Sequence, residues 1–460
     1  MDAAHAVDIA SLARQLKEEL AAAEASAARP TSGCPIVIAE VGALTRNVDP
    51  AEYEPHHISI GPYHRTKNPD LARDDDKVRC LGAVLSAATA TTLEAYLTEL
   101  ASLEGRARSC YASAFEQMDS TEFVRMLLLD GCYVLVRFGG DGAPRANGHV
   151  QGGSSYRYGG ALLASGDMME AVAVVRDVFY LAENQIPFFV VDKIHQLTVP
   201  DAGVSAADAI AGYVRKILRG QQYSVATPAM EGPPEPGNLL HLLHMHLTPT
   251  VLSSPATSNN VTGKRRVGRW RTATEYHCAG VGFRTRSLGG KDARSILDVK
   301  LDGGGGTLEI PRLNIDAETW RILRNLMALE QRNPAIWSHV TAYSVFVSQL
   351  ACTPRDVELL SRRGVISHGL GSHDEVAELF ADLCKGVAFK ADDPGGNYLG
   401  ETWQALEGRF GSRPRRWAAW LMLRYFRNPW LAVGLAAAAV GLLCTVVQAV
   451  FSVLSYTPAT

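Results

Sequence analysis

The chain has 460 residues, of which 47% are hydrophobic and 20% are charged. This composition excludes a wholly disordered or collagen-like chain. The formal net charge of −3 argues against a dedicated nucleic-acid-binding protein, whose domain would be clearly basic. We therefore expect a large globular protein that has no nucleic acid among its partners.

The N-terminal segment, residues 1–30, is rich in alanine and predicts an amphipathic helix that ends at Pro30. It carries several acidic residues and lacks a continuous apolar core, so it is not a secretory signal. None of the eight cysteines stands in a CxxC or zinc-ligand spacing, and we expect free thiols in a reducing compartment.

Residues 35–407 are expected to form one domain that is mostly helical. Apolar residues that recur with helical period predict one helix over Lys77–Leu103 and another over Phe115–Phe138. Three segments of biased composition are predicted to be flexible loops, at residues 139–166, 224–237 and 248–268.

Strand character is confined to one region of this domain. Short runs at residues 281–283, 296–301 and 307–310 suit strands, and the glycine-rich turn at 302–306 joins the last two. This spacing predicts an antiparallel meander. The expected fold class is therefore mainly α, a helical domain with a small antiparallel β element and, as argued next, one C-terminal transmembrane helix.

No charged residue follows Arg427, and residues 428–456 are almost entirely apolar. A helix over residues 430–456 would span roughly 40 Å, which is enough to cross a hydrocarbon layer about 30 Å thick. We therefore predict a single membrane span. The residues assigned to it include Trp430, Leu431, Gly434, Gly441, Leu442, Leu443, Val446 and Val447.

The segment 408–427 that precedes this span is basic and aromatic. Glu407 is the last acidic residue, and six arginines follow it. The positive-inside rule then predicts that the main domain lies in the cytosol. Because the N-terminus is not a secretory signal, we expect the span to be a C-terminal anchor, in the plasma membrane. Membrane lipid is an expected partner. The small residues of the span would also allow a homo-oligomer, although alanine and glycine composition alone explains them equally well.

Signatures of known enzymes are missing from the sequence, including metalloprotease, hydrolase and nucleotide-binding motifs. His241 and His244 would share a helix face and could hold a metal, but no carboxylate or cysteine stands nearby in sequence. An ordinary amphipathic helix is preferred there, and we predict neither a metal nor a cofactor. Glu183–Gln185 precede Pro187, and we expect them to bond backbone groups that a helix kink frees.

Several motifs occur in order along the chain and together resemble a plant family, the domain of unknown function 247 proteins. The motif residues are Ser59, Gly61, Pro62, Tyr63, His64, Asp130, Gly131, Glu183, Asn184, Gln185, Pro187, Asn325, Glu330 and Gln331. The chain departs from the family at Ala182, where leucine is usual, and this puts one packing contact in doubt.

The resemblance implies a plant-specific protein with one C-terminal helical anchor and no assigned biochemical activity. Some grass members of the family are implicated as pollen-side determinants of gametophytic self-incompatibility. The resemblance supplies no catalytic residue. Our leading hypothesis is a membrane-anchored, non-enzymatic recognition or signalling protein with an unidentified protein partner. The alternative is a membrane-bound enzyme that uses Glu183 and Glu330 in a pocket.

Overall fold

The computed structural model of the chain describes residues 14–15, 17, 36–88, 91–140, 168–200, 203–225, 235–250, 271–289, 293–304, 306–391, 396–410 and 429–456. The helix expected over residues 1–30 lies almost wholly outside these residues. The same holds for the basic segment 408–427 and for most of the three predicted loops.

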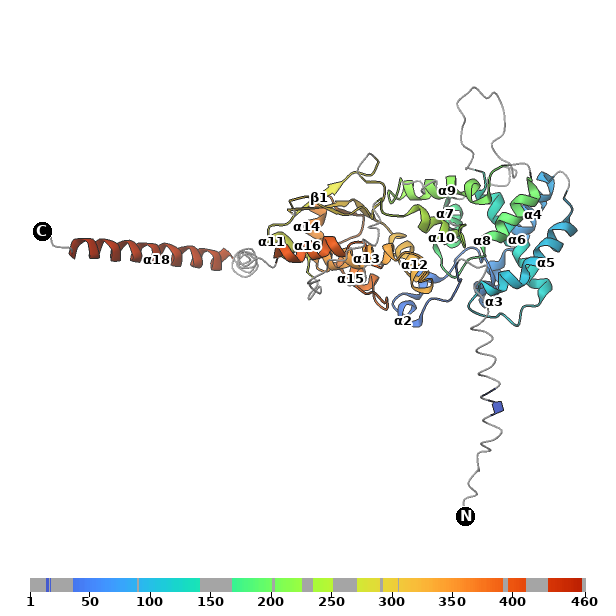
Figure 1. Cartoon of the computed structure of the whole chain (residues 1–460), viewed down its shortest axis with the longest axis horizontal. Helices are drawn as coiled ribbons and strands as arrows, with labels where there is room; N and C mark the ends of the chain where they lie inside the picture. The colour runs from blue at the N-terminus through green and yellow to red at the C-terminus, as the bar shows by residue number, and fades with distance from the viewer. Residues whose placement is uncertain are drawn as a thin grey trace, which may run out of the picture.

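Helices make up the N-terminal half of the described chain. They are α2 (Ala43–Arg46), η1 (Pro50–Tyr53), α3 (Pro62–Lys67), η2 (Pro69–Ala72), α4 (Asp74–Ala87), α5 (Leu93–Ser109), α6 (Ser120–Phe138), α7 (Met168–Val175), the π-helical turn η4 (Arg176–Tyr180), α8 (Phe188–Thr198) and α9 (Ala206–Gly220). Helices α4, α5 and α8 pack around α6 at one end of the body (Figure 1). The central position of α6 follows from its sequence, which is apolar on nearly every face.

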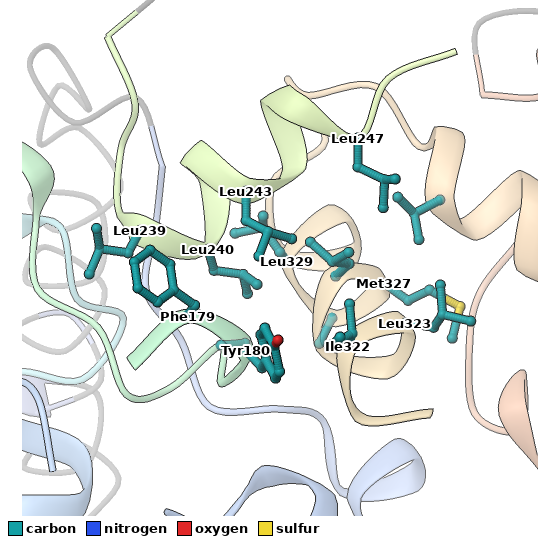
Figure 2. Close-up of a cluster of buried hydrophobic side chains, with 14 of the residues drawn as sticks. Phe179, Tyr180, Leu239, Leu240, Leu243, Leu247, Ile322, Leu323, Met327 and Leu329 are labelled. Carbon is teal, nitrogen blue, oxygen red and sulfur yellow. The ribbon is translucent and has the colours of Figure 1, made fainter. Parts of the chain in front are cut away.

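The C-terminal half is also mostly helical. Its helices are α10 (Leu239–His246), α11 (Ala273–Cys278), α12 (Thr319–Arg332), α13 (His339–Leu350), α14 (Pro354–Arg362), α15 (His373–Leu383), α16 (Gly400–Phe410) and α18 (Pro429–Tyr456). Helix α12 joins the two halves through an apolar core. Figure 2 shows Tyr180 of η4, Leu243 of α10 and Leu329 of α12 in this core, and all three are buried.

The predicted helix boundaries differ from the structure at two places. The single helix expected over Lys77–Leu103 is two helices, because the chain becomes extended at Ala88 and α5 starts only after the extended Thr92. Helix α6 begins at Ser120 rather than at Phe115. Its start is fixed by the Asp119 side chain, which accepts a hydrogen bond from the Glu122 N–H at 2.7 Å.

The antiparallel meander predicted near residues 281–310 is wrong in its pairing. The strands are β1 (Gly282–Arg286), β2 (Lys300–Leu301) and β3 (Thr307–Pro311), in the order β1-β3-β2. β2 and β3 are antiparallel, but β1 and β3 are parallel. The glycine-rich turn fixes only the β2–β3 pair, since a turn determines the pairing of the two strands that it joins.

A second small sheet has no counterpart among the predicted strands. β4 (Leu313–Ile315) pairs in parallel with β5 (Ile366–His368). Helices α12, α13 and α14 lie between them in sequence, which is the kind of connection that a parallel pair requires. Three-residue strands of this kind carry too little periodicity to be found by pattern.

The predicted transmembrane helix requires correction. Figure 1 shows α18 (Pro429–Tyr456) as one helix that extends away from the body. Within the part of the chain that the structure describes, no helix has the length and apolarity needed to cross a membrane. The prediction rested on an uncharged run, in which small residues dominate Gly434–Gly441. Alanine and glycine contribute much less apolar area than leucine or valine. The fold class is mainly α with small sheets.

One cysteine differs from expectation. Cys110 follows α5 and is disulfide-bonded. The expectation of free thiols is therefore wrong for Cys110. The described cysteines with free thiols are Cys80, Cys132, Cys278, Cys352, Cys384 and Cys444.

Candidate functional site

The opening motif and the Glu183–Gln185 motif contact each other in the folded chain. The Asn184 side chain accepts a hydrogen bond from the Ile60 N–H at 2.7 Å and donates one to the Ile58 carbonyl at 3.0 Å. It thereby pairs with the extended backbone that precedes α3, much as a neighbouring strand would. Two segments far apart in sequence are fixed to each other by one buried amide.

Gln185 bonds backbone groups on both sides. Its amide nitrogen donates to the Val178 and Leu181 carbonyls at the end of the π-helical turn η4. Its carbonyl oxygen accepts from the Leu239 and Leu240 N–H groups at the start of α10. A helix start leaves several N–H groups without intrahelical partners, and Gln185 provides an acceptor for two of them.

Asp130 of α6 connects the second motif to the first. Its Oδ2 accepts from the Gly61 N–H at 2.7 Å, and its Oδ1 lies 2.5 Å from Nζ of Lys77. The Lys77 ammonium also donates to the Ser59 carbonyl at 2.7 Å. Both charged side chains are fully buried. An ion pair of this kind is stable only because each partner has further hydrogen bonds.

Two motif glycines lie where chain segments pack closely. Gly61 has φ +77° and ψ −175°, a conformation almost restricted to glycine. A Cβ atom there would overlap the Gln185 carbonyl oxygen. At Gly131 a Cβ atom would overlap the Ile194 side chain, so this glycine lets α6 and α8 approach closely.

Asp177 belongs to the same network, although sequence patterns did not single it out. Its Oδ2 accepts from three consecutive backbone N–H groups, those of His56, His57 and Ile58, at 2.6–3.0 Å. The other carboxylate oxygen, Oδ1, lies 3.4 Å from Nε of Arg176, so both oxygens of this buried group have partners. The available signal was an acidic residue within the apolar stretch from α7 to η4.

Glu183 is buried among cationic and histidine side chains. Its Oε1 pairs with the Arg46 guanidinium and accepts from the Val41 N–H at 2.5 Å. Its Oε2 lies 3.6 Å from Nε2 of His64. Burial lowers the pKa of His64 to about 4, although the nearby Glu54 carboxylate opposes this shift. His64 is therefore neutral at pH 7.

The remaining motif residues also have structural partners. Asn325 of α12 accepts from the Ala182 N–H at 2.9 Å and donates to the Glu52 carbonyl, and Gln331 accepts from the Ala388 N–H at 3.0 Å. Ala182 itself is buried. Pro62 occupies the first position of α3, and Pro187 lies immediately before α8. The Tyr63 hydroxyl donates a hydrogen bond to the Ile38 carbonyl.

These residues form one unit, which we call the motif network: Ser59, Gly61, Lys77, Asp130, Asp177, Glu183, Asn184, Gln185 and Asn325. Their side chains or backbones bond one another or the backbone of adjacent segments. Two of the three motif carboxylates, Asp130 and Glu183, accept hydrogen bonds from the backbone within this network. It connects α3, α4, α6, α10 and α12 into one rigid body.

A second buried group lies where α10, α12 and α13 meet. We call His244, Glu330 and His339 the histidine cluster. Nε2 of His244 lies 2.8 Å from Oε1 of Glu330, and the two imidazole rings stack with their centroids 4.2 Å apart. One metal-ligating atom from each residue lies within 4.8 Å of the others. Glu330 and the Glu183 carboxylate have different partners and belong to separate networks.

Burial controls protonation in this cluster. It lowers the pKa of His244 to about 4 and that of His339 to about 3. It raises the pKa of Glu330, although the nearby His339 and hydrogen bonds from Val340 and Thr341 oppose that shift. His241, which shares the α10 face with His244, is outside the cluster. Its Nδ1 accepts from the Gly237 N–H at 3.0 Å.

An open groove of about 870 Å³ lies on the surface next to the motif network. Three arginines and five carboxylates take part in its lining, which consists of Arg65, Thr66, Pro69, Asp70, Ala72, Arg73, Asp74, Asp75, Asp76, Arg79, Gln117, Met118 and Glu122. We call it the acidic groove. Its lining comes from α3, η2, the first turns of α4, and the chain around the start of α6.

The charges of the acidic groove are unequally paired. Arg65 bonds both oxygens of Asp74, at 2.9 and 3.0 Å, while Arg73 and Arg79 both pair with Asp76. Burial would raise the pKa of Asp74, yet its bonds to Arg65 and Arg125 lower it to about 2. Three exposed carboxylates make no ion pair with a described residue, namely those of Asp70, Asp75 and Glu122.

Comparison with known proteins gives consistent matches in plants. The sequence model of DUF247, described as a plant protein of unknown function, matches residues 38–444. The UPF0481 protein At3g47200 of Arabidopsis thaliana is 25% identical over 432 residues, which cover 89% of this chain and 84% of that protein. The putative UPF0481 protein At3g02645 of the same plant is 31% identical over 116 residues, 25% of this chain and 21% of that protein. No solved structure gives a significant match.

Proposed function

Because the chain belongs to the DUF247 family of plant proteins, whose function is unknown, we propose its role from its own surface: it is a recognition protein that binds a partner through the acidic groove. The observation that carries this proposal is the surplus of unpaired carboxylates there. The groove arginines are engaged, whereas the exposed Asp70, Asp75 and Glu122 form no ion pair with any residue that the structure describes and so can pair with a partner. The partner is a protein segment rich in lysine or arginine.

The lining of the groove favours a protein partner over a small molecule. Pockets for small ligands are mostly apolar with a few placed polar groups. The acidic groove is instead open and is lined largely by charged side chains. Surfaces of this kind direct association through complementary charge, which increases the association rate and selects the partner.

The motif network supports this role by fixing the walls of the groove. Gly61 and Asp130 hold the chain where α3 begins, and Lys77 lies one turn inside α4. The groove is therefore formed by backbone that is already ordered before binding. Preordered surfaces lose less conformational entropy when a partner binds. In this proposal the shared motifs build the scaffold, and exposed side chains determine which partner binds.

The proposal does not use the motif carboxylates as catalytic groups. An active site with two carboxylates requires that they face one reacting atom. Glu183 bonds Val41 and Arg46, whereas Glu330 bonds His244 and the start of α13. The two groups share no partner among the described contacts, so the arrangement favours recognition over the alternative of a Glu183–Glu330 enzyme.

The test is a charge reversal in the groove with a matched control. The groove variant carries Asp75→Lys and Glu122→Lys. The control carries Glu378→Lys and Glu401→Lys, two exposed positions on α15 and α16. Binding is measured by fluorescence anisotropy against synthetic peptides of equal length that contain increasing numbers of lysine and arginine, and by crosslinking in plant extracts.

The groove variant should bind basic peptides at least about tenfold more weakly than the wild-type protein, and the affinity of the control should be unchanged. The same crosslinked proteins should be lost with the groove variant alone. Equal binding by both variants would show that the acidic groove is not the recognition surface.

A further inference from the structure

The histidine cluster combines the donor groups of a metal site with a buried imidazole whose nitrogens make no well-formed hydrogen bond to a described residue. We propose that His244, Glu330 and His339 bind one Zn²⁺ ion. Two imidazoles and one carboxylate are a common ligand set for this metal. The inference is independent of the acidic groove and of any protein partner.

The positions of the donor atoms suit a single ion. One donor atom from each residue lies within 4.8 Å of the others. Zinc–ligand bonds of about 2.0–2.1 Å place neighbouring ligands about 3.3 Å apart in a tetrahedral site. Side-chain rotations that move the atoms by about an ångström would bring all three into coordination distance. Burial favours neutral imidazoles, which is the form that binds metals.

His339 provides the second observation that indicates a ligand. Its side chain is buried, with 4% of the residue exposed. Neither Nδ1 nor Nε2 makes a hydrogen bond of normal length and angle with a described residue, although the Leu247 backbone lies close enough to oppose the lowering of the His339 pKa. Buried polar atoms are rarely left without a partner, because the loss of hydration costs about 1–3 kcal/mol. A bound metal ion would coordinate one of these nitrogens.

The carboxylate is already oriented for coordination. Glu330 accepts from the Val340 N–H at 2.9 Å, and its second oxygen accepts from the N–H and the hydroxyl of Thr341 at 2.7 and 2.5 Å. Hydrogen bonds of this type hold ligating carboxylates in place in metal sites. Oε1 therefore faces Nε2 of His244 in a fixed position, with His339 stacked on the other ring.

The location of the site indicates a structural role for the metal. The three ligands come from α10, α12 and the first residue of α13. Figure 2 shows α10 and α12 side by side at the core where Leu243 and Leu329 pack. One ion would cross-link three helices. Since the ligands are buried, the metal is taken up as the protein folds and stabilises the folded state.

His241 provides a matched control. It lies on the same helix, one turn before His244, and its Nδ1 is occupied by the Gly237 N–H. The substitution His241→Asn keeps an acceptor for that N–H and should leave zinc binding unchanged. The substitution His339→Phe removes a ligand and both imidazole nitrogens while preserving a buried aromatic ring, so the metal-free variant should still fold.

The experiment uses the full chain, loaded with ZnSO₄, desalted and analysed for metal by mass spectrometry. Wild type and His241→Asn should retain about one zinc per chain, and His339→Phe and Glu330→Gln should each lose at least about 90% of it. Co²⁺ added in place of zinc should give a visible d–d absorption band only in the first two proteins. Circular dichroism verifies that all four are folded.

If His339→Phe fails to fold, the Glu330→Gln variant still tests the proposal, because glutamine keeps an oxygen acceptor for the N–H groups at the start of α13. The proposal is overturned if folded wild-type protein, refolded with excess zinc, retains none. It is also overturned if folded His339→Phe or Glu330→Gln retains as much zinc as wild type.

Discussion

The motif network and the histidine cluster both bury carboxylates, but they compensate the charge differently. In the motif network, Asp130 pairs with Lys77, and Asp177 accepts from three backbone N–H groups. In the histidine cluster, Glu330 faces two neutral imidazoles, and the His339 nitrogens make no well-formed hydrogen bond to a described residue. In the motif network the buried polar groups connect chain segments. In the histidine cluster the nitrogens of His339 are still able to bind a ligand.

The strongest test of this difference is Gly61→Ala in the motif network. A methyl group there would overlap the Gln185 carbonyl oxygen, and alanine disfavours the backbone conformation of Gly61. We expect a loss of more than about 4 kcal/mol in the free energy of unfolding, or failure to fold. Urea unfolding followed by circular dichroism measures the loss.

The matched control for that change is Gly82→Ala in α4. No atom lies within 4 Å of the position that its Cβ would take. Alanine in a helix is favoured over glycine by about 1 kcal/mol, so this variant should be slightly more stable than wild type. A Gly61→Ala protein as stable as wild type would contradict the close packing of the two motifs.

A smaller loss is expected when the charge pair of the motif network is broken. Asp130→Asn leaves the Lys77 ammonium buried without its counter-ion. Removal of one partner from a buried ion pair costs about 3–5 kcal/mol. Urea unfolding should show this loss, and the double variant Lys77→Met/Asp130→Asn should recover part of it. If the double variant is destabilised by the sum of both single changes, the two groups do not interact.

The smallest predicted effect concerns pH and the histidine cluster. The pKa of His339 is lowered to about 3 in the folded chain, so the unfolded chain binds this proton first as pH falls below about 6.5. Stability is therefore lost as pH decreases. Between pH 6.5 and 5, His339 alone accounts for a loss of about 2 kcal/mol in the free energy of unfolding.

Comparison with His339→Phe isolates that contribution. Urea unfolding of metal-free protein at pH 7.5, 6.5, 5.5 and 5.0 should show a shallower decline for the variant, by about 2 kcal/mol at the lowest pH. The raised pKa of Glu330 acts in the opposite direction, because it favours proton uptake by the folded chain. Parallel curves for both proteins would indicate that His339 titrates normally in the folded state.

Local patterns in the sequence predicted helices better than pairings. The helical class, the break near Pro187 and the loop-joined β2–β3 pair depend on residues close together in the chain. The position of β1 beside β3, in parallel, depends on a crossover that no local pattern encodes. The transmembrane assignment used absence of charge as a measure of apolarity. Among the described residues, no helix is both long enough and apolar enough to cross a membrane.

The candidate sites show the same limit. Glu183–Gln185 were expected to bond backbone near the kink, and Gln185 does bond Val178 and Leu181. Its partners at Leu239 and Leu240 could not be predicted, because they lie more than 50 residues away. The sequence places His244 on a helix face that could hold a metal, but no carboxylate stands close to it in the chain. Glu330 and His339 supply the missing donors only after α12 and α13 fold against α10.

A contact made by the residues just before α2 limits when the chain can fold during translation. Val37 donates its N–H to the Asn333 side chain across a separation of 296 residues. At about 5–20 residues per second, a ribosome needs about 15–60 s to synthesise the chain between them. During that time Val37 lacks the Asn333 side chain that accepts its N–H in the folded chain. The contact between Val37 and Asn333 can therefore form only after nearly three-quarters of the chain has been translated.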